Sequence, residues 1–563
     1  MNAFDKTRRR LKQLTPCAVL LGLLPGLAQA QVGPSAGSVL QQVAPPPPAL
    51  MPPGPVIVLP PSGAQPISSS VMIPVSRIVI TGNHLLPTAM LQSLVAPAQG
   101  QRMNLATLQA YVAQITHAYH VHGYPIAYAY LPPQSIRDGV VDVAVMEPRY
   151  DEVQVTGQSR FSAGMVRHTV DVQSGAPVTL DTLNRSLLLL DQTPGLEVAG
   201  NLIPGAQPQT STLQIVRHDL PLFTLDASEN NYGNRYTGTY LTNATVTAND
   251  PFGYGSLLSV NGIASSTGGL KASGFNVVSP DIWNGLRAGV YGTSIFYQLG
   301  GKFASLREAG REMQIGGDLT YPLILQPGRV LNVRFDTEGD WLAQSTRSTR
   351  SLSEQMIMSE QLSLNGAMAD DFGGVTSADL SFSHGVLAIS PGAAKAVDAS
   401  GPKAEGGYLI GQVQLGRTQN LPEGFVLTGD ANGQVSDKNL DSSQQLYLGG
   451  PYGVMSYPVG AGGGDEGYLL SAELEHGVPT PGLPGQVSVS ALAQNGTVWV
   501  NHTVYKGFTG RNRISETGVG LGLAYDWQRF SATASYVVRV GRNSAPGDYN
   551  GGDQVWFQVN LAL

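Results

Sequence analysis

The sequence predicts a membrane β-barrel of about 16 antiparallel strands, preceded by two small α/β domains. Strand-like runs alternate with turns from residue 221 to residue 563, and no convincing helix interrupts them. Charged residues make up 13% of the chain, about half the share usual in soluble domains, whereas glycine occurs 68 times and tyrosine 22 times. After the N-terminal segment no apolar run reaches about 18 residues, so strands would have to cross the membrane.

The N-terminal residues 1–30 are expected to be a secretory signal peptide. Five basic residues between positions 6 and 12 precede an apolar run over 18–27, and 28–30 read Ala-Gln-Ala. Removing this segment would change the formal net charge from −7 to −11, and an acidic chain argues against nucleic acid as a partner. Removal would also take away Cys17, the single cysteine, and with it any disulfide or thiolate metal site.

Residues 31–71 are predicted to form a proline-rich spacer. Prolines cluster over 45–61 and favour an extended polyproline II conformation over a packed core. One helical turn over 38–43 is the regular structure that the pattern allows. We expect this segment to carry no chemistry of its own.

Two copies of one small α/β unit are expected over residues 72–148 and 149–218. In the first copy, Asn104 should cap a helix with apolar residues at helical spacing, and Gly123 should end it. Both copies have the order strand, helix, helix, strand, strand. The expected segments are 77–81, 88–94, 104–123, 126–131 and 140–145, and then 152–156, 162–170, 179–190, 196–202 and 211–216. Tandem copies imply a binding array outside the membrane.

The remaining residues, 219–563, are expected to form the barrel. Its strands should have one face toward lipid and one toward water, because apolar and polar residues alternate along them. Tryptophans 283, 341, 499, 527 and 556 fall near strand ends, where aromatic girdles lie. A soluble β-sandwich is the less favoured alternative. The expected strands are 223–230, 236–247, 255–264, 270–278, 286–295, 313–321, 330–337, 354–367, 374–383, 407–417, 425–434, 468–476, 487–498, 516–527, 530–538 and 554–561.

A long glycine-rich loop separates the eleventh and twelfth of these strands. Residues 448–470 read LGGPYGVMSYPVGAGGGDEGYLL. A linker has no need for the apolar and aromatic residues in this stretch, whereas its glycines permit positive φ and close backbone contact. We therefore interpret the loop, 446–466, as a packed element, with a mobile surface loop as the alternative.

Residues 120–150, HVHGYPIAYAYLPPQSIRDGVVDVAVMEPRY, resemble the closing half of the first POTRA domain of two-partner secretion transporters, the TpsB family. The family pattern is a helix end, Gly-Tyr, a strand leading into Pro-Pro-Gln, Asp-Gly and a final strand. The residues that match this POTRA motif are Gly123, Tyr124, Pro132, Gln134, Asp138 and Gly139.

The glycine-rich loop resembles the sixth extracellular loop of the same family, which folds back into the barrel. The loop motif residues are Leu448, Gly449, Gly450, Val454, Met455, Tyr457, Gly464 and Asp465. The family motif Val-Arg-Gly/Ala-Tyr reads Val-Met-Ser-Tyr here, so its arginine is absent. The barrel-wall aspartate that this arginine meets in the family is replaced by Gln494, two residues before Gly496. The joint loss of both charges avoids an unpaired buried ion, and it leaves open whether the loop is anchored as in the family.

Catalytic and metal chemistry are not expected. His117, His120 and His122 lie close in sequence, but they fall at the end of an expected helix, where cationic histidines have a structural role. The sequence has no G-x-S-x-G elbow and no H-E-x-x-H motif, and its glycine clusters lack the lysine of a phosphate loop. We therefore expect no enzyme, no metal and no cofactor.

The resemblance implies a two-partner secretion transporter in the bacterial outer membrane. Its POTRA domains would capture an unfolded, TpsA-like exoprotein in the periplasm by adding an extended strand to a sheet edge, and the barrel would pass it outward. Outer-membrane lipid and the barrel assembly machinery are the other expected partners. An outer-membrane protein insertase of the same superfamily and a passive porin or receptor remain as alternatives.

Overall fold

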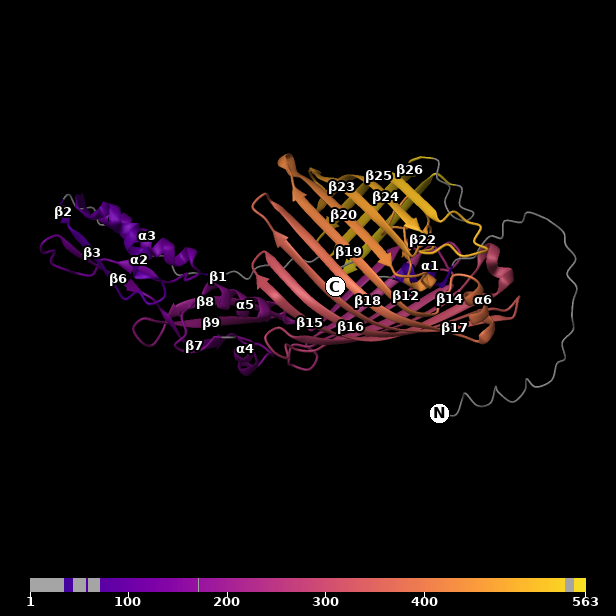
Figure 1. Ribbon diagram of the computed structural model, residues 1–563, viewed down its shortest axis with the longest axis horizontal. Helices are drawn as coiled ribbons and strands as arrows, with labels where there is room; N and C mark the ends of the chain where they lie inside the picture. Colours follow the sequence, from indigo (N-terminus) through magenta and orange to yellow (C-terminus); the bar gives the residue numbers. More distant parts are fainter. Residues whose placement is uncertain (1–34, 44–56, 59–70, 171, 542–550) are drawn as a thin grey trace, which may run out of the picture. The chain divides into compact units, whose positions relative to one another are not determined.

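The computed structural model describes residues 35–43, 57–58, 71–170, 172–541 and 551–563. These residues form a closed barrel of 16 strands together with smaller sheets and helices N-terminal to it (Figure 1). The predicted fold class, a 16-stranded antiparallel barrel preceded by α/β structure, is confirmed. The signal peptide expected over 1–30 lies outside the described residues.

Each barrel strand pairs antiparallel with its neighbours, and β10 pairs with β27 to close the barrel. The strands are β10 (Phe223–Asn230), β11 (Leu241–Asn249), β12 (Leu257–Ser265), β13 (Leu270–Val278), β14 (Arg287–Gln298), β15 (Glu308–Gln326), β16 (Arg329–Thr346), β17 (Ser351–Ala369), β18 (Gly374–Ser390), β19 (Gly406–Asn420), β20 (Phe425–Ser436), β23 (Glu466–Val478), β24 (Gln486–Trp499), β25 (Arg513–Trp527), β26 (Phe530–Arg539) and β27 (Asp553–Ala562). Closure leaves no unpaired strand edge in the barrel wall.

Strands β15 to β18 are 17 to 19 residues long and extend beyond their expected ends. Between β18 and β19 the chain forms a helix, α6 (Gly392–Ser400), where the sequence predicted none. The helix ends where the Asp398 carboxylate accepts hydrogen bonds from the backbone amides of Ala404 and Glu405 over 2.8 and 3.1 Å. This side chain fixes the return into β19.

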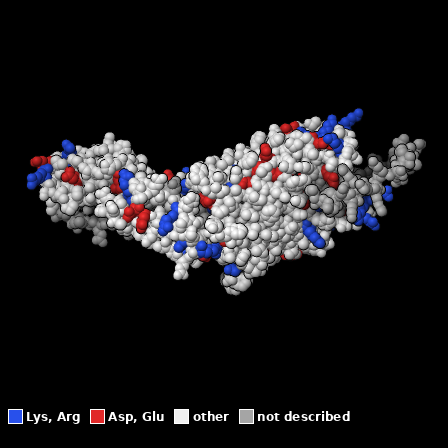
Figure 2. Space-filling model, turned by 90° about the horizontal axis from the view of Figure 1, so that it is seen from below, with Lys and Arg blue, Asp and Glu red and all other residues white. Residues whose placement is uncertain are grey.

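The two faces of the barrel wall differ in polarity, as the alternation predicted. On β27, Val555, Val559 and Leu561 are 56%, 37% and 41% exposed on the outer face. Figure 2 shows a broad area without Lys, Arg, Asp or Glu on the face of the molecule seen there. Such a surface suits contact with lipid.

The first α/β domain has a three-stranded sheet of order β3-β6-β5 and a separate β2-β4 pair. Its helix α3 begins after Asn104, whose side chain accepts a hydrogen bond from the amide of Thr107, as predicted. Apolar residues of α2, α3 and the sheet form one core. The elements are β2 (Met72–Val75), β3 (Arg77–Thr81), α2 (Thr88–Val95), β4 (Gln101–Asn104), α3 (Leu105–Val121), β5 (Tyr128–Tyr130) and β6 (Val140–Met146).

The second α/β domain repeats the helices and strands and has its own core. Ser162 and Thr179 cap its two helices through hydrogen bonds from backbone amides. Its sheet has the order β1-β8-β9-β7, where β1 (Ile57–Val58) pairs parallel with β8 and covers that edge. The other elements are β7 (Arg149–Thr156), α4 (Ala163–Thr169), α5 (Leu180–Asp191), β8 (Leu196–Pro204) and β9 (Thr210–Asp219).

A short helix near the N-terminus, α1 (Ala36–Leu40), continues into η1 (Gln41–Val43) and lies within the barrel (Figure 1). None of the helices in the described residues is long and apolar enough to cross a membrane.

Candidate functional site: the inward-folded loop and the barrel interior

Residues 446–466 form a loop that turns back on itself between β20 and β23. Its base is a two-stranded pair of β21 (Leu446–Tyr447) with β22 (Gly463–Gly464). A Cβ atom at Gly453 would lie 1.9 Å from a backbone carbonyl oxygen of the same loop, so only glycine fits there. The two limbs of the loop backbone therefore pack closely against each other at Gly453.

The motif residues at the tip of the loop are fully buried. Val454, Ser456 and Tyr457 are each 0% exposed. Val454 and Tyr457 pack with Ala461 of the loop and with Leu469 on the inner face of β23. Val454 and Tyr457 thus belong to a packed core, whereas Tyr452 is 48% exposed.

Met455 contacts the barrel wall through its backbone and its side chain. Its amide donates to Oε1 of Gln494 on β24 over 2.8 Å, and its carbonyl accepts from Nε1 of Trp556 on β27 over 2.7 Å. The thioether side chain packs beside Leu492, Val537 and Trp556. The wall therefore holds the main chain at this position, and no charged side chain is needed at 455 for the contact.

Two ionisable wall residues lie beside the loop. The Nε of Arg539 on β26 donates to the carbonyl of Ser456 over 3.1 Å, and its guanidinium lies 4.5 Å from the centre of the Tyr457 ring. Glu516 on β25 is 0% exposed, and a Cβ at Gly462 would lie 3.0 Å from its Oε1. Burial raises the pKa of the Tyr457 phenol, the Glu516 carboxylate raises it further, and Arg539 lowers it. One basic and one acidic side chain of the wall thus flank the loop.

The predicted wall partner Gly496 lies at a point where the loop closely approaches β24. A Cβ at Gly496 would lie 2.6 Å from Cδ2 of Leu448, which is 0% exposed. Gly449 and Gly450 donate their amides to the carbonyls of Ala461 and Tyr457 within the loop, over 3.1 Å in both cases. Leu448 is thus held between the loop and the wall.

Asp465 joins the end of the loop to its neighbours. Its carboxylate accepts hydrogen bonds from Nε2 of Gln445 over 2.8 Å and from the amide of His502 over 2.9 Å. The amide of Asp465 donates to the carbonyl of Trp499. Burial raises the pKa of the Asp465 carboxyl, while the two hydrogen bonds to the carboxylate act in the opposite direction. The carboxylate thus joins the end of the loop to Gln445 and to His502, which follows β24.

Helix α1 occupies the barrel interior next to this loop. Val39 is 0% exposed and packs with apolar residues of β11, β13 and β14. Oε1 of Gln42 accepts from the amide of Asn234 over 2.8 Å and from Oγ1 of Thr237 over 3.0 Å. Residues 35–43 therefore differ from the spacer expected over 31–71, because they are packed and hydrogen-bonded inside the barrel.

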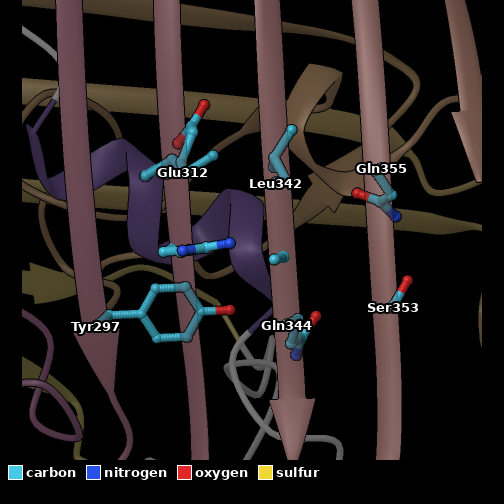
Figure 3. Close-up of a pocket in the computed structure, with 9 residues that line it drawn as sticks. Tyr297, Glu312, Leu342, Gln344, Ser353 and Gln355 are labelled. Carbon is cyan, nitrogen blue, oxygen red and sulfur yellow. The ribbon is translucent and has the colours of Figure 1, made fainter. Parts of the chain in front are cut away.

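The barrel wall beside α1 carries mixed polar and apolar side chains. Figure 3 shows them on neighbouring strands, with the helix behind. Leu40 of α1 lines the same pocket. The labelled residues are Tyr297, Glu312, Leu342, Gln344, Ser353 and Gln355.

A second cavity, of about 1010 Å³, lies between the loop and the opposite wall. Tyr452 and Met455 of the loop line one side of it. Arg334 on β16, which pairs with Asp336 over 2.6 Å, lines the other. Its remaining wall residues are mostly polar, among them Glu338, Gln361, Asn365, Asp379, Asp430 and Glu473. The interior is therefore a wet, charged space.

The POTRA motif residues have structural positions in the first α/β domain. The Gln134 side chain pairs with β6 like an added strand, because its Nε2 donates to the carbonyl of Asp142 and its Oε1 accepts from that residue's amide. It also donates to the carbonyl of Pro132 over 3.3 Å. This amide holds the segment between β5 and β6 in place.

The Gly-Tyr and Asp-Gly pairs terminate elements of the same domain. Gly123 follows the end of α3 with a φ of 83°, and Tyr124 packs edge to face on Tyr119 at 6.0 Å. Asp138 and Gly139 both have positive φ immediately before β6. The geometry assigns these residues to the fold of the domain.

The histidines at the end of α3 lie beside backbone carbonyls. Nε2 of His120 is 3.1 Å from the carbonyl oxygen of Ala127, and Nδ1 of His122 is 2.7 Å from that of Ala118. Across the described residues no group of three His, Cys, Asp or Glu side chains is placed to hold a metal ion.

Sequence reasoning missed three wall residues that contact the loop. Trp556 was expected in an aromatic girdle, but it is 5% exposed and points into the barrel. Its place on the polar side of the β27 alternation was the signal for this. Arg539 and Glu516 carried no such signal, because strand register alone brings them beside a loop that is distant in sequence.

The chain also matches known families over most of its length. Residues 73–148 match the POTRA domain, ShlB-type, and residues 209–525 match the haemolysin secretion/activation protein ShlB/FhaC/HecB family. The chain belongs to this family. It is a two-partner secretion transporter of the outer membrane, with POTRA structure on the periplasmic side, and it translocates a secreted exoprotein.

Two named relatives align over most of their length. The heme/hemopexin transporter protein HuxB of Haemophilus influenzae strain 86-028NP is 27% identical over 469 residues, which is 82% of each chain. The outer membrane transporter CdiB of Dickeya dadantii is 21% identical over 421 residues, which is 71% of each.

Solved structures share the fold at lower identity. CdiB from Escherichia coli has a TM-score of 0.72 at 19% identity, covering 95% of this chain and 100% of that one. CdiB from Acinetobacter baumannii has a TM-score of 0.62 at 16% identity, covering 88% and 91%. Both likenesses concern the fold.

Proposed function

We propose that the transporter passes its exoprotein in an extended state along the polar cavity beside loop 446–466, with the loop held on the barrel wall as one side of the route. The observation that carries this proposal is the contact between the loop main chain at Met455 and Gln494 and Trp556. The mostly polar lining of the cavity favours passage, because polar side chains reduce the apolar surface on which an unfolded chain would stall.

The uncharged contact at Met455 replaces the family arginine and aspartate in this proposal. Gln494 supplies one hydrogen bond to a backbone amide, whereas Arg539 supplies a positive charge from the wall. In the family the contact is made by a loop side chain, whereas here wall side chains bind the loop backbone. We therefore infer that the loop motif residues contribute to secretion by keeping the loop on the barrel wall.

A disulfide between loop and wall tests whether the loop stays docked during transport. An ideal Cβ at Gly518 on β25 would lie 3.0 Å from Cβ of Ser456, so the pair Ser456→Cys/Gly518→Cys is close to disulfide distance. We expect oxidised cells to secrete the cognate exoprotein at the level of reduced cells. Secretion that stops on oxidation and returns with reductant would show that the loop must leave the wall.

The transport role has a separate test. Cells without the chain should retain the cognate exoprotein in the periplasm, where its unfolded segment is open to degradation. Cells with the chain should release it to the medium. Release that is equal in both would contradict the transport role for that exoprotein and would leave the loop geometry untouched.

The outer surface of the barrel and its closed wall indicate two further partners, membrane lipid and an assembly machinery. We infer that outer-membrane lipid covers the apolar outer face, and that the barrel assembly machinery inserts the chain, since a closed barrel cannot enter the membrane strand by strand with its edges unpaired. Depletion of that machinery should reduce the heat-modifiable, folded form on gels. An unchanged folded fraction would contradict this requirement.

A further inference from the structure

Two ionisable residues face outward from the barrel among apolar side chains. Glu360 is the central residue of β17, and His384 lies directly opposite it on β18 in the antiparallel register. Both side chains are exposed. Neither residue belongs to the loop, the cavity or the α/β domains described above.

The register fixes the direction of both side chains. The neighbours Ser359 and Gln361 line the interior cavity, and Oγ of Ser383 donates to Oε1 of Gln361 across the inner face. Successive residues of a strand point to opposite faces of the sheet. Glu360 and His384 therefore point away from the interior, toward the membrane.

Apolar residues surround this pair on the outer face. On β17, Met358 and Leu362 flank Glu360 and are 47% and 53% exposed. On β18, Phe382 and Val386 flank His384 and are 63% and 46% exposed. The apolar surface continues toward both ends of the two strands through Met356, Leu364, Met368 and Leu380. The pair thus lies within the band that lipid would cover.

Ionisable side chains in such a band are rare, and they usually meet a polar partner. Within the part of the chain that the structure describes, neither side chain forms a hydrogen bond or an ion pair. Thr337 lies opposite Glu360 on β16 and adds a hydroxyl to the same row. Acyl chains offer no hydrogen bond to any of these groups, so a protein surface is the better complement.

We propose that this outer face, the Glu360 surface (Thr337, Met358, Glu360, Leu362, Phe382, His384 and Val386), docks on the same surface of a second copy of the chain in the outer membrane. A carboxylate accepts hydrogen bonds and an imidazole donates them. A two-fold axis along the membrane normal, between β17 and β18, brings each Glu360 to the partner's His384. The surface is therefore complementary to itself, as an isologous interface requires.

The surrounding residues suit such a contact. Met358, Leu362 and Phe382 offer adaptable and aromatic contact area around the polar pair. Gly339 on β16 belongs to the same face, because a Cβ there would meet the side chains of Trp341 and Met358. Apolar contact then encloses the reciprocal hydrogen bonds.

Cysteine cross-linking in outer membranes tests the proposal on the full chain. The sequence has one cysteine, Cys17, so Cys17→Ser gives a cysteine-free background. Leu362→Cys places a thiol near the proposed axis. Leu521→Cys is the matched control, because Leu521 is 65% exposed on the outer face of β25, six strands further around the barrel. We expect at least tenfold more disulfide-linked dimer from position 362 than from position 521.

Charge variants in the Leu362→Cys background test the role of the pair. Glu360→Leu should lower the dimer yield several-fold, since the partner's imidazole loses its acceptor. The exchange Glu360→His with His384→Glu keeps self-complementarity and should restore the yield. The folded fraction, read from heat-modifiable mobility on gels, should be the same in all variants.

Three results would overturn the proposal. Equal dimer yields at positions 362 and 521 would indicate random collision. An adduct of a mass other than twice that of the chain would assign the surface to a different protein. A Glu360→Leu variant that cross-links as well as its parent would show that the pair does not hold the interface.

Discussion

At the scale of single residues, only some of the wall side chains that hold the loop could be predicted from the sequence. Gln494 was identified through its place in the family pattern, and the structure puts its carbonyl oxygen on the Met455 amide. Arg539 could not be identified in the same way, because it lies 84 positions after Met455 and nothing but strand register brings them together. Comparison with a family motif identifies a residue that occupies a motif position, such as Gln494. It does not identify a residue such as Arg539, which lies on a strand outside the motif.

A double-mutant cycle tests the exchange at Met455 and Gln494. Met455→Arg should impair folding and secretion, because it adds a cation beside Gln494 and near Arg539 without a counterion. Gln494→Asp in the same chain should recover about 1 to 3 kcal/mol of the loss. Thermal unfolding of the purified barrel and secretion of the exoprotein measure both effects. Additive effects of the two changes would mean that the loop is not docked there.

Arg539 and Glu516 form a second testable pair. Arg539→Met should destabilise the barrel by about 1 to 3 kcal/mol, because it removes the hydrogen bond to the Ser456 carbonyl and the cation near the buried Glu516 side chain. Arg539→Met with Glu516→Gln should recover part of that loss, since the second change removes an acid that has lost its neighbouring cation. Denaturant unfolding of the three variants gives the comparison. A double variant as unstable as Arg539→Met alone would show that the two charges do not interact.

At the scale of elements, amphipathic periodicity predicted the α/β helices and their caps. The sequence also allowed a helical turn over 38–43, but it did not indicate that α1 would lie inside the barrel. A helix of so few residues is marginal by propensity and depends on tertiary contact. Its apolar residues match walls contributed by β11, β13 and β14, which sequence alone does not bring together. The same limit applies to strands β15 to β18, whose extensions beyond the expected ends depend on pairing with the neighbouring strands.

The packing of α1 predicts a size limit at Gly37. A Cβ at Gly37 would lie 1.8 Å from the carbonyl oxygen of Ser442, so Gly37→Leu should displace α1 from its place. Because α1 fills part of the interior, we expect ion conductance in planar bilayers to rise several-fold. Gly392→Leu in α6 is the control, since no atom lies within 4 Å of a Cβ there. Equal conductance in both variants would mean that α1 does not obstruct the barrel.

At the scale of the whole molecule, strand number and fold class were predictable because they depend on patterns repeated along the chain. Alternation and low charge recur along the barrel strands, so local errors of a few residues leave the total of 16 unchanged. The interior was not predictable, because it depends on which distant segments meet inside a closed wall. The loop was recognised from its glycines, whereas its partners required the register.

The last prediction concerns the α/β region, residues 72–218. Each of its two domains has its own core, so the tandem expressed alone should fold as a soluble unit. It should bind the N-terminal segment of the cognate exoprotein in a non-native state, because an extended chain can add a strand to an open sheet edge. The folded form of the same segment is the control, since its backbone groups are already paired. Circular dichroism checks folding and calorimetry checks binding. If the folded tandem does not bind the non-native segment, these domains do not capture the exoprotein, and the barrel would have to do so.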